Sequence, residues 1–243
     1  MLPKTVIKQI RSLSLKKIRN QEKLFVVEGV KMVEEALRSE YVIREIYTLD
    51  AASFPNATIV TPLEMAQITH FSTPSPALAL LEQAQNLESD TPFLERGTLY
   101  LGLEAIRDPG NLGTIIRIAD WFGIHKIFAS TDTAELYNPK VIQATMGSLF
   151  RVTVVYADLN TLLSRTDVPV WGALLEGKSI YQTDLSSNGI VLIGNESHGL
   201  SPQLKEKINH PLFIPRYPLQ SAGAESLNAA VATAIICAAF RKG

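Results

Sequence analysis

Residues 190–200 read IVLIGNESHGL, an apolar run of strand length that passes directly into Gly194-Asn195-Glu196. Glycine permits a tight, exposed backbone, so Glu196 is expected at the carboxyl end of a strand. Ligands of open α/β sheets bind outside the carboxyl ends of the strands. The stretch therefore predicts an α/β fold with a candidate functional loop. A plain strand-to-helix turn, with Ser201-Pro202 starting the next helix, is the simpler explanation.

The same alternation of strand and helix continues on both sides of this loop, from residue 98 onward. The other expected strands are residues 99–103, 126–129, 152–156, 170–175 and 212–214, and helical segments lie between most of them. This order is typical of a parallel sheet covered by helices on both faces.

The preceding region predicts a smaller α/β unit. Its expected elements are strands at residues 24–27, 42–49 and 77–81, a helix at 30–37, and a capping box with a proline at the first helical position, Thr61-Pro62-Leu63-Glu64. The acidic, polar stretch that follows contains Pro92 and is expected to be a linker. The predicted domains are residues 1–82, a linker at 83–97, and residues 98–243.

Composition favours a globular chain in a reducing, cytoplasmic setting. Of 243 residues, 46% are apolar and 19% charged, which is ordinary for a protein with a substantial core. The single Cys237 rules out an intramolecular disulfide and a cysteine-rich metal site. The longest apolar run, residues 229–240, is too short to cross a bilayer, so no membrane association is expected.

The net charge of −1 is unevenly distributed. Residues 1–23 carry seven basic side chains against the single acidic Glu22, a balance of +6 that leaves −7 for the rest of the chain. Such asymmetry suggests a surface that faces nucleic acid, and Lys16, Lys17 and Arg19 are the expected RNA contacts. A solvated helix face explains the same pattern equally well.

Residues 172–179, GALLEGKS, match the phosphate-binding pattern of P-loop nucleotide hydrolases. That loop needs a helix directly behind it, so that the helix end cradles the phosphate. Here Ala173, Leu174 and Leu175 are expected to end a buried strand, and a short polar segment with an Asn188-Gly189 turn follows. Nucleotide hydrolysis is therefore a minor alternative.

Two further segments carry candidate functional residues. Residues 108–124, DPGNLGTIIRIADWFGI, predict a loop followed by a helix, with Asn111 in the entering loop and Arg117 away from the buried stripe. In residues 214–240, Ser226-Leu227-Asn228 precedes a long apolar helix. Taken singly, Asn111, Ser226 and Asn228 are explained by helix capping and Arg117 by a surface position.

In this order on a strand–helix frame, the three segments resemble the SpoU (TrmH-like) family of RNA ribose 2′-O-methyltransferases, in the SPOUT superfamily. The family's motifs stand here as Asn111 with Arg117, Gly194-Asn195-Glu196 and Ser226-Leu227-Asn228, and the stretch NPKVIQATMGSLFRV from Asn138 is also similar. The resemblance covers residues 98–243. Residues 1–82 resemble the small α/β RNA-binding extension that many members carry.

The resemblance implies a C-terminal α/β-knot, a parallel sheet with helices on both faces whose chain forms a trefoil knot. It also implies a homodimer joined through the knotted region, with the active site near the subunit boundary. S-adenosylmethionine would be the methyl donor, and no metal is required. The residues implied to contact the donor are Leu174, Gly194, Ile214 and Leu227.

The catalytic residues that the resemblance implies are Asn111, Arg117, Glu196, Ser226 and Asn228. Arginine is not normally deprotonated in proteins, so Arg117 is expected to clamp RNA phosphate and polarise the 2′-hydroxyl rather than act as a base. The sequence leaves open whether the substrate is transfer or ribosomal RNA. An RNA-binding module with an inactive methyltransferase half is the remaining alternative.

Overall fold

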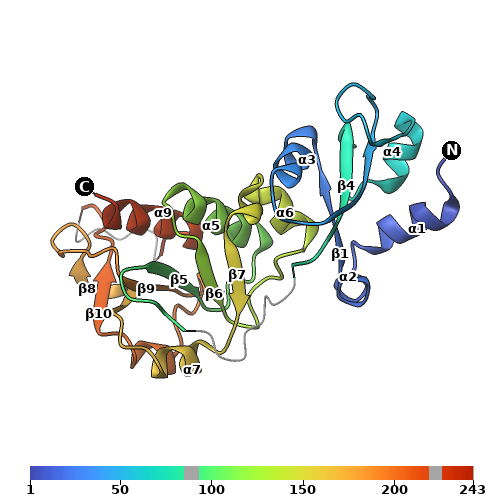
Figure 1. The fold of residues 1–243 in the computed structure, drawn as a ribbon. Helices are drawn as coiled ribbons and strands as arrows, with labels where there is room; N and C mark the ends of the chain where they lie inside the picture. The colour runs from blue at the N-terminus through green and yellow to red at the C-terminus, as the bar shows by residue number, and fades with distance from the viewer. Residues whose placement is uncertain (85–92, 219–225, 243) are drawn as a thin grey trace. The chain divides into compact units, whose positions relative to one another are not determined.

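The strand–helix alternation after residue 98 forms a six-stranded sheet in which every neighbouring pair is parallel, in the order β10-β8-β9-β5-β6-β7 (Figure 1). The protein is described here by a computed structural model that covers residues 1–84, 93–218 and 226–242. The strands are β5 (Leu99–Leu103), β6 (Lys126–Ala129), β7 (Thr153–Tyr156), β8 (Val170–Ser179), β9 (Gly189–Ile193) and β10 (His210–Phe213). The predicted parallel sheet is confirmed.

Helices cover both faces of this sheet. Helices α5 (Pro109–Trp121) and α9 (Ala229–Phe240) lie side by side on one face, and α7 (Leu159–Ser164) lies on the other (Figure 1). Helix α8 (Pro202–Lys205) packs with α7. The core beneath α7 and α8 includes Tyr100, Phe128, Ile190, Leu192 and Leu204. Apolar side chains thus pack against both faces of the sheet, and polar side chains lie at the ends of its strands.

The chain leaves β9 and β5 in opposite directions. From β5 it passes through α5 to β6 on one side of the sheet, and from β9 it passes through α8 to β10 on the other. In open α/β sheets the crevice at such a reversal of strand order is where ligands bind. The loops after Leu103 and Ile193 flank this crevice.

Strand β8 is longer than expected and contains an excursion. His210 and Pro211 of β10 pair with Trp171 and Gly172, whereas Leu212 pairs next with Lys178, so residues 173–177 leave the register. Residues 172–179 therefore lie within strand β8 rather than in a loop that opens a helix. This geometry excludes the phosphate-binding loop of a nucleotide hydrolase.

The first 85 residues form a second compact unit around a four-stranded sheet of order β1-β4-β2-β3. Its elements are α1 (Lys4–Ser12), α2 (Lys16–Glu22), β1 (Leu24–Glu28), α3 (Val30–Leu37), β2 (Ile43–Thr48), β3 (Thr58–Ile59), α4 (Pro62–Ile68) and β4 (Ala77–Glu82). Helix α4 begins with the predicted capping box, in which Thr61 and Glu64 exchange hydrogen bonds. Most of the predicted linker, residues 85–92, lies outside the described residues.

A segment from the middle of the chain completes this smaller unit. Residues 135–151, with α6 (Pro139–Thr145) and the 3₁₀ turn η1 (Ser148–Phe150), cluster with residues 1–85. The ring centroids of Tyr137 and Phe25 are 4.5 Å apart, and those of Phe150 and Tyr41 are 5.3 Å apart. The sequence had placed this stretch within residues 98–243. Its burial against β1 was not foreseen, because its aromatic partners are more than a hundred residues away.

Candidate active site

Side chains from three loops of the larger unit form one hydrogen-bonded chain. Asn228 Nδ2 donates to Asn111 Oδ1 at 2.8 Å, and Asn111 Nδ2 donates to Glu196 Oε1. Ser226 Oγ donates to the backbone carbonyl of Glu196 at 3.5 Å. Four of the five residues proposed as catalytic from the sequence therefore lie together.

Capping of α9 sets the direction of this chain. Asn228 is the N-cap, and its Oδ1 accepts hydrogen bonds from the backbone N–H groups of Ala230 at 3.0 Å and Val231 at 3.2 Å. Its Nδ2 is therefore the atom that faces Asn111. Since Asn111 accepts through Oδ1, its own Nδ2 is left to donate to Glu196, which acts as the acceptor at the end of the chain.

Asn111 lies within α5 and not in the loop before it, so the sequence prediction was wrong on this point. The N-cap is Asp108, whose Oδ1 accepts from the backbone N–H of Asn111 at 2.8 Å. Pro109 follows at the first helical position, which it favours because its missing N–H costs nothing there. The first turn of α5 thus holds the Asn111 side chain rigidly toward Glu196.

The loop that carries Glu196 is closed on itself. Asn195 and Gly199 exchange backbone hydrogen bonds of 3.2 and 2.8 Å. A Cβ on Gly194 would lie 2.4 Å from the carbonyl carbon of Gly199, so only glycine fits there. Asn195 Oδ1 accepts from the backbone N–H groups of Ser197 and His198, and its Nδ2 donates to the carbonyl of Ala105 at 3.0 Å. Glu196 is thereby presented on a rigid turn.

Arg117 is not joined to the other four residues. Six positions after Asn111, it is separated from that residue by roughly 120° around the helix axis, and it lies on an exposed face with Thr114 and Trp121. Within the described parts of the chain it makes no hydrogen bond or ion pair. Trp121 is 84% exposed, so this face carries an uncovered aromatic ring beside the arginine.

The four residues expected to contact S-adenosylmethionine lie at one end of the sheet. Leu174 belongs to the excursion in β8, Gly194 follows β9 and Ile214 follows β10, and these three strands are neighbours. Leu227 precedes Asn228 and is 45% exposed. Apolar side chains beside a glycine turn suit an adenine ring, so these residues fit the expected methyl donor.

The expected RNA contacts divide into two groups. Lys16 and Lys17 are exposed at the start of α2. Arg19 is only 2% exposed, donates to the carbonyls of Leu13 and Ser14 at 2.8 Å, and pairs with Glu135. The prediction that Arg19 contacts RNA is therefore wrong, because its guanidinium is used inside the protein.

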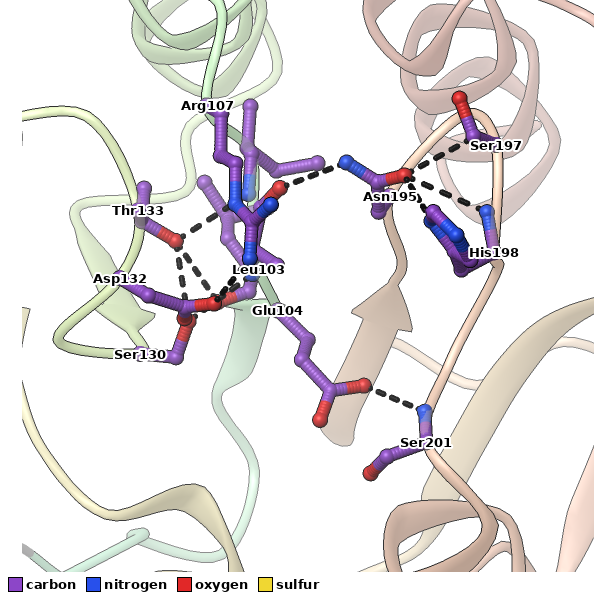
Figure 2. Close-up of polar contacts among 12 residues, drawn as sticks. Leu103, Glu104, Arg107, Ser130, Asp132, Thr133, Asn195, Ser197, His198 and Ser201 are labelled. Atoms are coloured by element: carbon purple, nitrogen blue, oxygen red, sulfur yellow. Dashed lines mark hydrogen bonds and ion pairs between the residues drawn. The ribbon is translucent and has the colours of Figure 1, made fainter.

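A polar cleft of about 480 Å³ at the ends of β5, β6 and β9 was not predicted. Figure 2 shows Glu104 pointing from β5 toward Ser201, with Arg107 and Asp132 on one side and Asn195 and His198 on the other. Glu104 directly follows the predicted strand at 99–103 and Arg107 lies three residues further on, which was the available signal.

An ion pair lies on one wall of this cleft. Arg107 Nη2 is 3.3 Å from Asp132 Oδ2. The Ser130 hydroxyl, which donates to Asp132 at 2.6 Å, lowers the pKa of that carboxyl, and the Arg107 guanidinium lowers it further. Asp132 is thus held ionised beside the arginine.

A metal-binding cluster and a membrane-spanning helix are both absent from the described residues, 1–84, 93–218 and 226–242. No three His, Cys, Asp or Glu side chains there are grouped to hold a metal ion. No helix in the same ranges is long and apolar enough to span a membrane.

Known proteins resemble the chain along most of its length. Residues 98–238 match the SpoU rRNA Methylase family, and residues 4–79 match the MRM3-like substrate binding domain. The 23S rRNA (guanosine(2553)-2′-O)-methyltransferase RlmP of Bacillus subtilis is 32% identical, over 95% of this chain and 93% of its own. A crystal structure of an AdoMet-bound rRNA methyltransferase from Sinorhizobium meliloti has a TM-score of 0.85 and 30% identity, over 100% of this chain and 96% of its own. A TrmH-family structure from Porphyromonas gingivalis has a TM-score of 0.86 and 35% identity, over 100% and 99% of the two chains.

Proposed function

The chain belongs to the SpoU family of the SPOUT superfamily, and from this premise we propose that it methylates ribosomal RNA. It is an S-adenosylmethionine-dependent RNA methyltransferase that acts on a ribose 2′-hydroxyl. Relatives named for 23S ribosomal RNA, one of which matches this chain nearly end to end, favour a ribosomal target. The observation that carries the assignment is the hydrogen-bonded chain of Asn111, Glu196 and Asn228 at the carboxyl ends of the strands.

Bound S-adenosylmethionine supplies a methyl group on a positively charged sulfur, which is already activated for transfer. The protein must align the ribose oxygen, accept its proton and exclude water. The Glu196 carboxylate is proposed to accept this proton. Asn111 and Asn228 hold the carboxylate in one orientation. Ser226 holds the backbone at Glu196. Leu174, Gly194, Ile214 and Leu227 are proposed to hold the donor.

Arg117 is proposed to clamp the phosphate of the target nucleotide and to polarise its 2′-hydroxyl. A guanidinium keeps its proton at any physiological pH, and its planar fork can hold two oxygens together. Since Arg117 is not joined to Glu196 within one chain, we assign it to the pocket that forms where two subunits meet.

The proposed homodimer is supported by the exposed surface of α5 and α9. Trp121 is 84% exposed and Val231 49% exposed, on two helices that lie side by side. Exposed apolar patches on a soluble domain commonly mark interaction sites. Burial of this face in a second copy would bring Arg117 to the subunit boundary.

Residues 1–82, completed by residues 135–151, are proposed as the RNA-binding domain, 83–97 as the linker and the rest of 98–243 as the methyltransferase domain. Lys16 and Lys17 supply exposed positive charge for RNA phosphate. A cytoplasmic location is proposed because ribosomal RNA is the substrate and the single Cys237 is free and buried.

Transfer of tritiated methyl groups to RNA from cells that lack this protein tests the function. Ribosomal RNA should be labelled, with 2′-O-methylation at a discrete position, and transfer RNA should not. Label confined to transfer RNA would change the substrate. Binding of RNA and S-adenosylmethionine without any transfer would favour the inactive RNA-binding module.

A further inference from the structure

We propose that the polar cleft beside the Glu196 loop binds the base of the target nucleotide and that Glu104 selects guanine. This inference rests on the proposed methyltransferase function and specifies its substrate. The cleft is lined by Glu104, Arg107, Asp132, Asn195, His198 and Ser201, together with neighbouring backbone.

The position of the cleft supports this assignment. It lies at the crevice between β9 and β5, where the chain leaves the sheet in opposite directions. Three of the four proposed S-adenosylmethionine contacts, Leu174, Gly194 and Ile214, lie instead on or after β8, β9 and β10. None of the four lines the cleft, so the cleft is left for a different ligand.

The cleft and the candidate catalytic residues share one loop. Asn195 lines the cleft and bonds the Ala105 carbonyl, whereas the next residue, Glu196, bonds Asn111. The ribose and the base of a nucleotide are directly bonded to each other, so two adjacent sites on the protein can bind them at the same time. A nucleotide whose 2′-hydroxyl meets Glu196 can therefore place its base in the cleft. A volume of about 480 Å³ is within the range of small-ligand pockets.

The chemistry of Glu104 favours a ligand rich in donors. One of its oxygens accepts from the backbone N–H of Ser201 at 2.6 Å, which fixes the carboxylate. Its other oxygen has no hydrogen-bond partner among the residues that the structure describes. A carboxylate only accepts hydrogen bonds when ionised, so a group bound there must present N–H or O–H donors, and the donors of a nucleobase are N–H groups.

Guanine is the base that meets this requirement best. Its pairing edge presents the N1–H and the 2-amino group side by side, and a carboxylate can accept from both. Uracil and cytosine would place carbonyl oxygens near the carboxylate, and adenine would place a ring nitrogen there. A site built to accept hydrogen bonds discriminates strongly against bases that cannot donate them.

Arg107 supplies the second contact. Its side chain is 70% exposed at the rim of the cleft, and Asp132 holds its guanidinium at 3.3 Å. Unstacked bases of RNA are commonly bound against arginine planes as well as aromatic rings. We assign Arg107 as the stacking surface for the base that Glu104 selects.

Calorimetry with nucleoside monophosphates tests the selectivity of the cleft. The full chain, saturated with S-adenosylhomocysteine, should bind guanosine 5′-monophosphate about tenfold or more tightly than the adenosine and uridine monophosphates. Inosine 5′-monophosphate, which lacks the 2-amino group, should bind more weakly than the guanosine nucleotide. Equal affinity for all four nucleotides would overturn the proposal.

Glu104→Gln is the informative variant. Its amide oxygen can still accept from Ser201, but its NH₂ group would face the two donors of guanine. The preference for guanosine 5′-monophosphate should disappear, while affinity for S-adenosylhomocysteine stays within about twofold. Glu206→Gln, at an exposed position after α8, is the matched control. An unchanged preference in Glu104→Gln would also overturn the proposal.

Methyl transfer provides an independent readout. Arg107→Ala should raise the KM for ribosomal RNA about tenfold or more. Arg96→Ala, which breaks a similarly exposed arginine–aspartate pair with Asp167, should leave the KM unchanged. Mapping of the methylated nucleotide to guanosine would support the proposal, and mapping to any other nucleoside would contradict it. Glu104-dependent nucleotide binding without methyl transfer to any RNA would instead refute the proposed function and leave the cleft assignment standing.

Discussion

The side chain of Asn228 divides its two polar atoms between helix capping and the candidate catalytic residues. Its oxygen caps α9, and its NH₂ group orients Asn111. Asn228→Asp should preserve the cap, because aspartate caps helices about as well as asparagine. It should still reduce methyl transfer by about 10²-fold, since a misplaced reacting group costs rates of that order.

Asn228→Ala is the companion variant. It removes both contacts and should lower the free energy of unfolding by about 0.5–2 kcal/mol in addition to the loss of rate. Single-turnover rates and denaturant midpoints for both variants separate the two effects. Near-normal activity in Asn228→Asp would mean that its contact with Asn111 has no catalytic role.

Arg117→Lys separates charge from geometry. Lysine retains the positive charge but cannot hold two oxygens in one plane. We expect the single-turnover rate to fall by about 10²-fold or more, because a positioning role is worth roughly that much. Affinity for S-adenosylmethionine should hardly change, and RNA affinity should fall only modestly. Activity within a few-fold of the wild type would mean that Arg117 contributes only its positive charge.

The sequence predicted the local positions of two candidate site residues. Glu196 follows an apolar strand and Asn228 precedes an apolar helix, so their positions could be inferred from periodicity. Arg19 could not be interpreted in this way, since its partner Glu135 lies 116 residues away. The position of Asn111 was also missed, because Asp108 and Asn111 are both plausible helix caps in sequence and only the structure shows that Asp108 is the cap and Asn111 lies inside the helix.

At the scale of elements, the capping box of α4 links stability to pH. Hydrogen bonds from the backbone of Thr61 and of Leu2 lower the pKa of Glu64 from 4.5 to about 2. The stabilisation is therefore complete above pH 4.5 and is lost as the pH falls through about 2. Glu64→Gln should lower the Tm at pH 7, and the difference from the wild type should shrink steadily below pH 4.5. A difference that is constant from pH 7 to pH 2.5 would show that the charge is not involved.

The ion pair between Arg19 and Glu135 joins α2 to the segment that precedes α6. Arg19→Ala should lower the free energy of unfolding by about 3 kcal/mol, the lower end of the cost of breaking a buried pair, because Arg19 is 2% exposed but Glu135, which loses its partner, is 15% exposed. Arg11→Ala, at an exposed position on α1, should cost little. Denaturant unfolding of the two variants measures the contrast. Equal stability would mean that the pair contributes nothing to the smaller unit.

Elements were easier to predict than their irregularities. The parallel strands were recognised from short apolar runs between helices, and α4 from its capping box. The excursion at residues 173–177 was not foreseen. It arises from the pairing of β8 with β10, and Lys178 comes opposite Leu212 only once the two strands are aligned. Register between distant strands is a property of the sheet rather than of either segment.

At the scale of the whole molecule, the proposed dimer interface can be tested through α5. Trp121→Glu should convert a species of twice the chain mass of 26.7 kDa into a monomer, since a charge would be placed in an apolar contact. Light scattering at micromolar concentration measures the mass. Leu63→Glu, at an exposed apolar position on α4, is the control and should leave the mass unchanged. A wild-type chain that is already a monomer would contradict the proposed dimer.

The contribution of residues 135–151 to the smaller unit has a consequence for synthesis. Phe25 and Tyr41 emerge from the ribosome early, but Tyr137 and Phe150, which pack against them, are made 52 and 65 residues after Gln85. At translation rates of about 5–20 residues per second, this delay is roughly 3–13 s. During this time one face of β1 in the amino-terminal unit remains uncovered. It can be covered only after β5, α5 and β6 of the larger unit have been made.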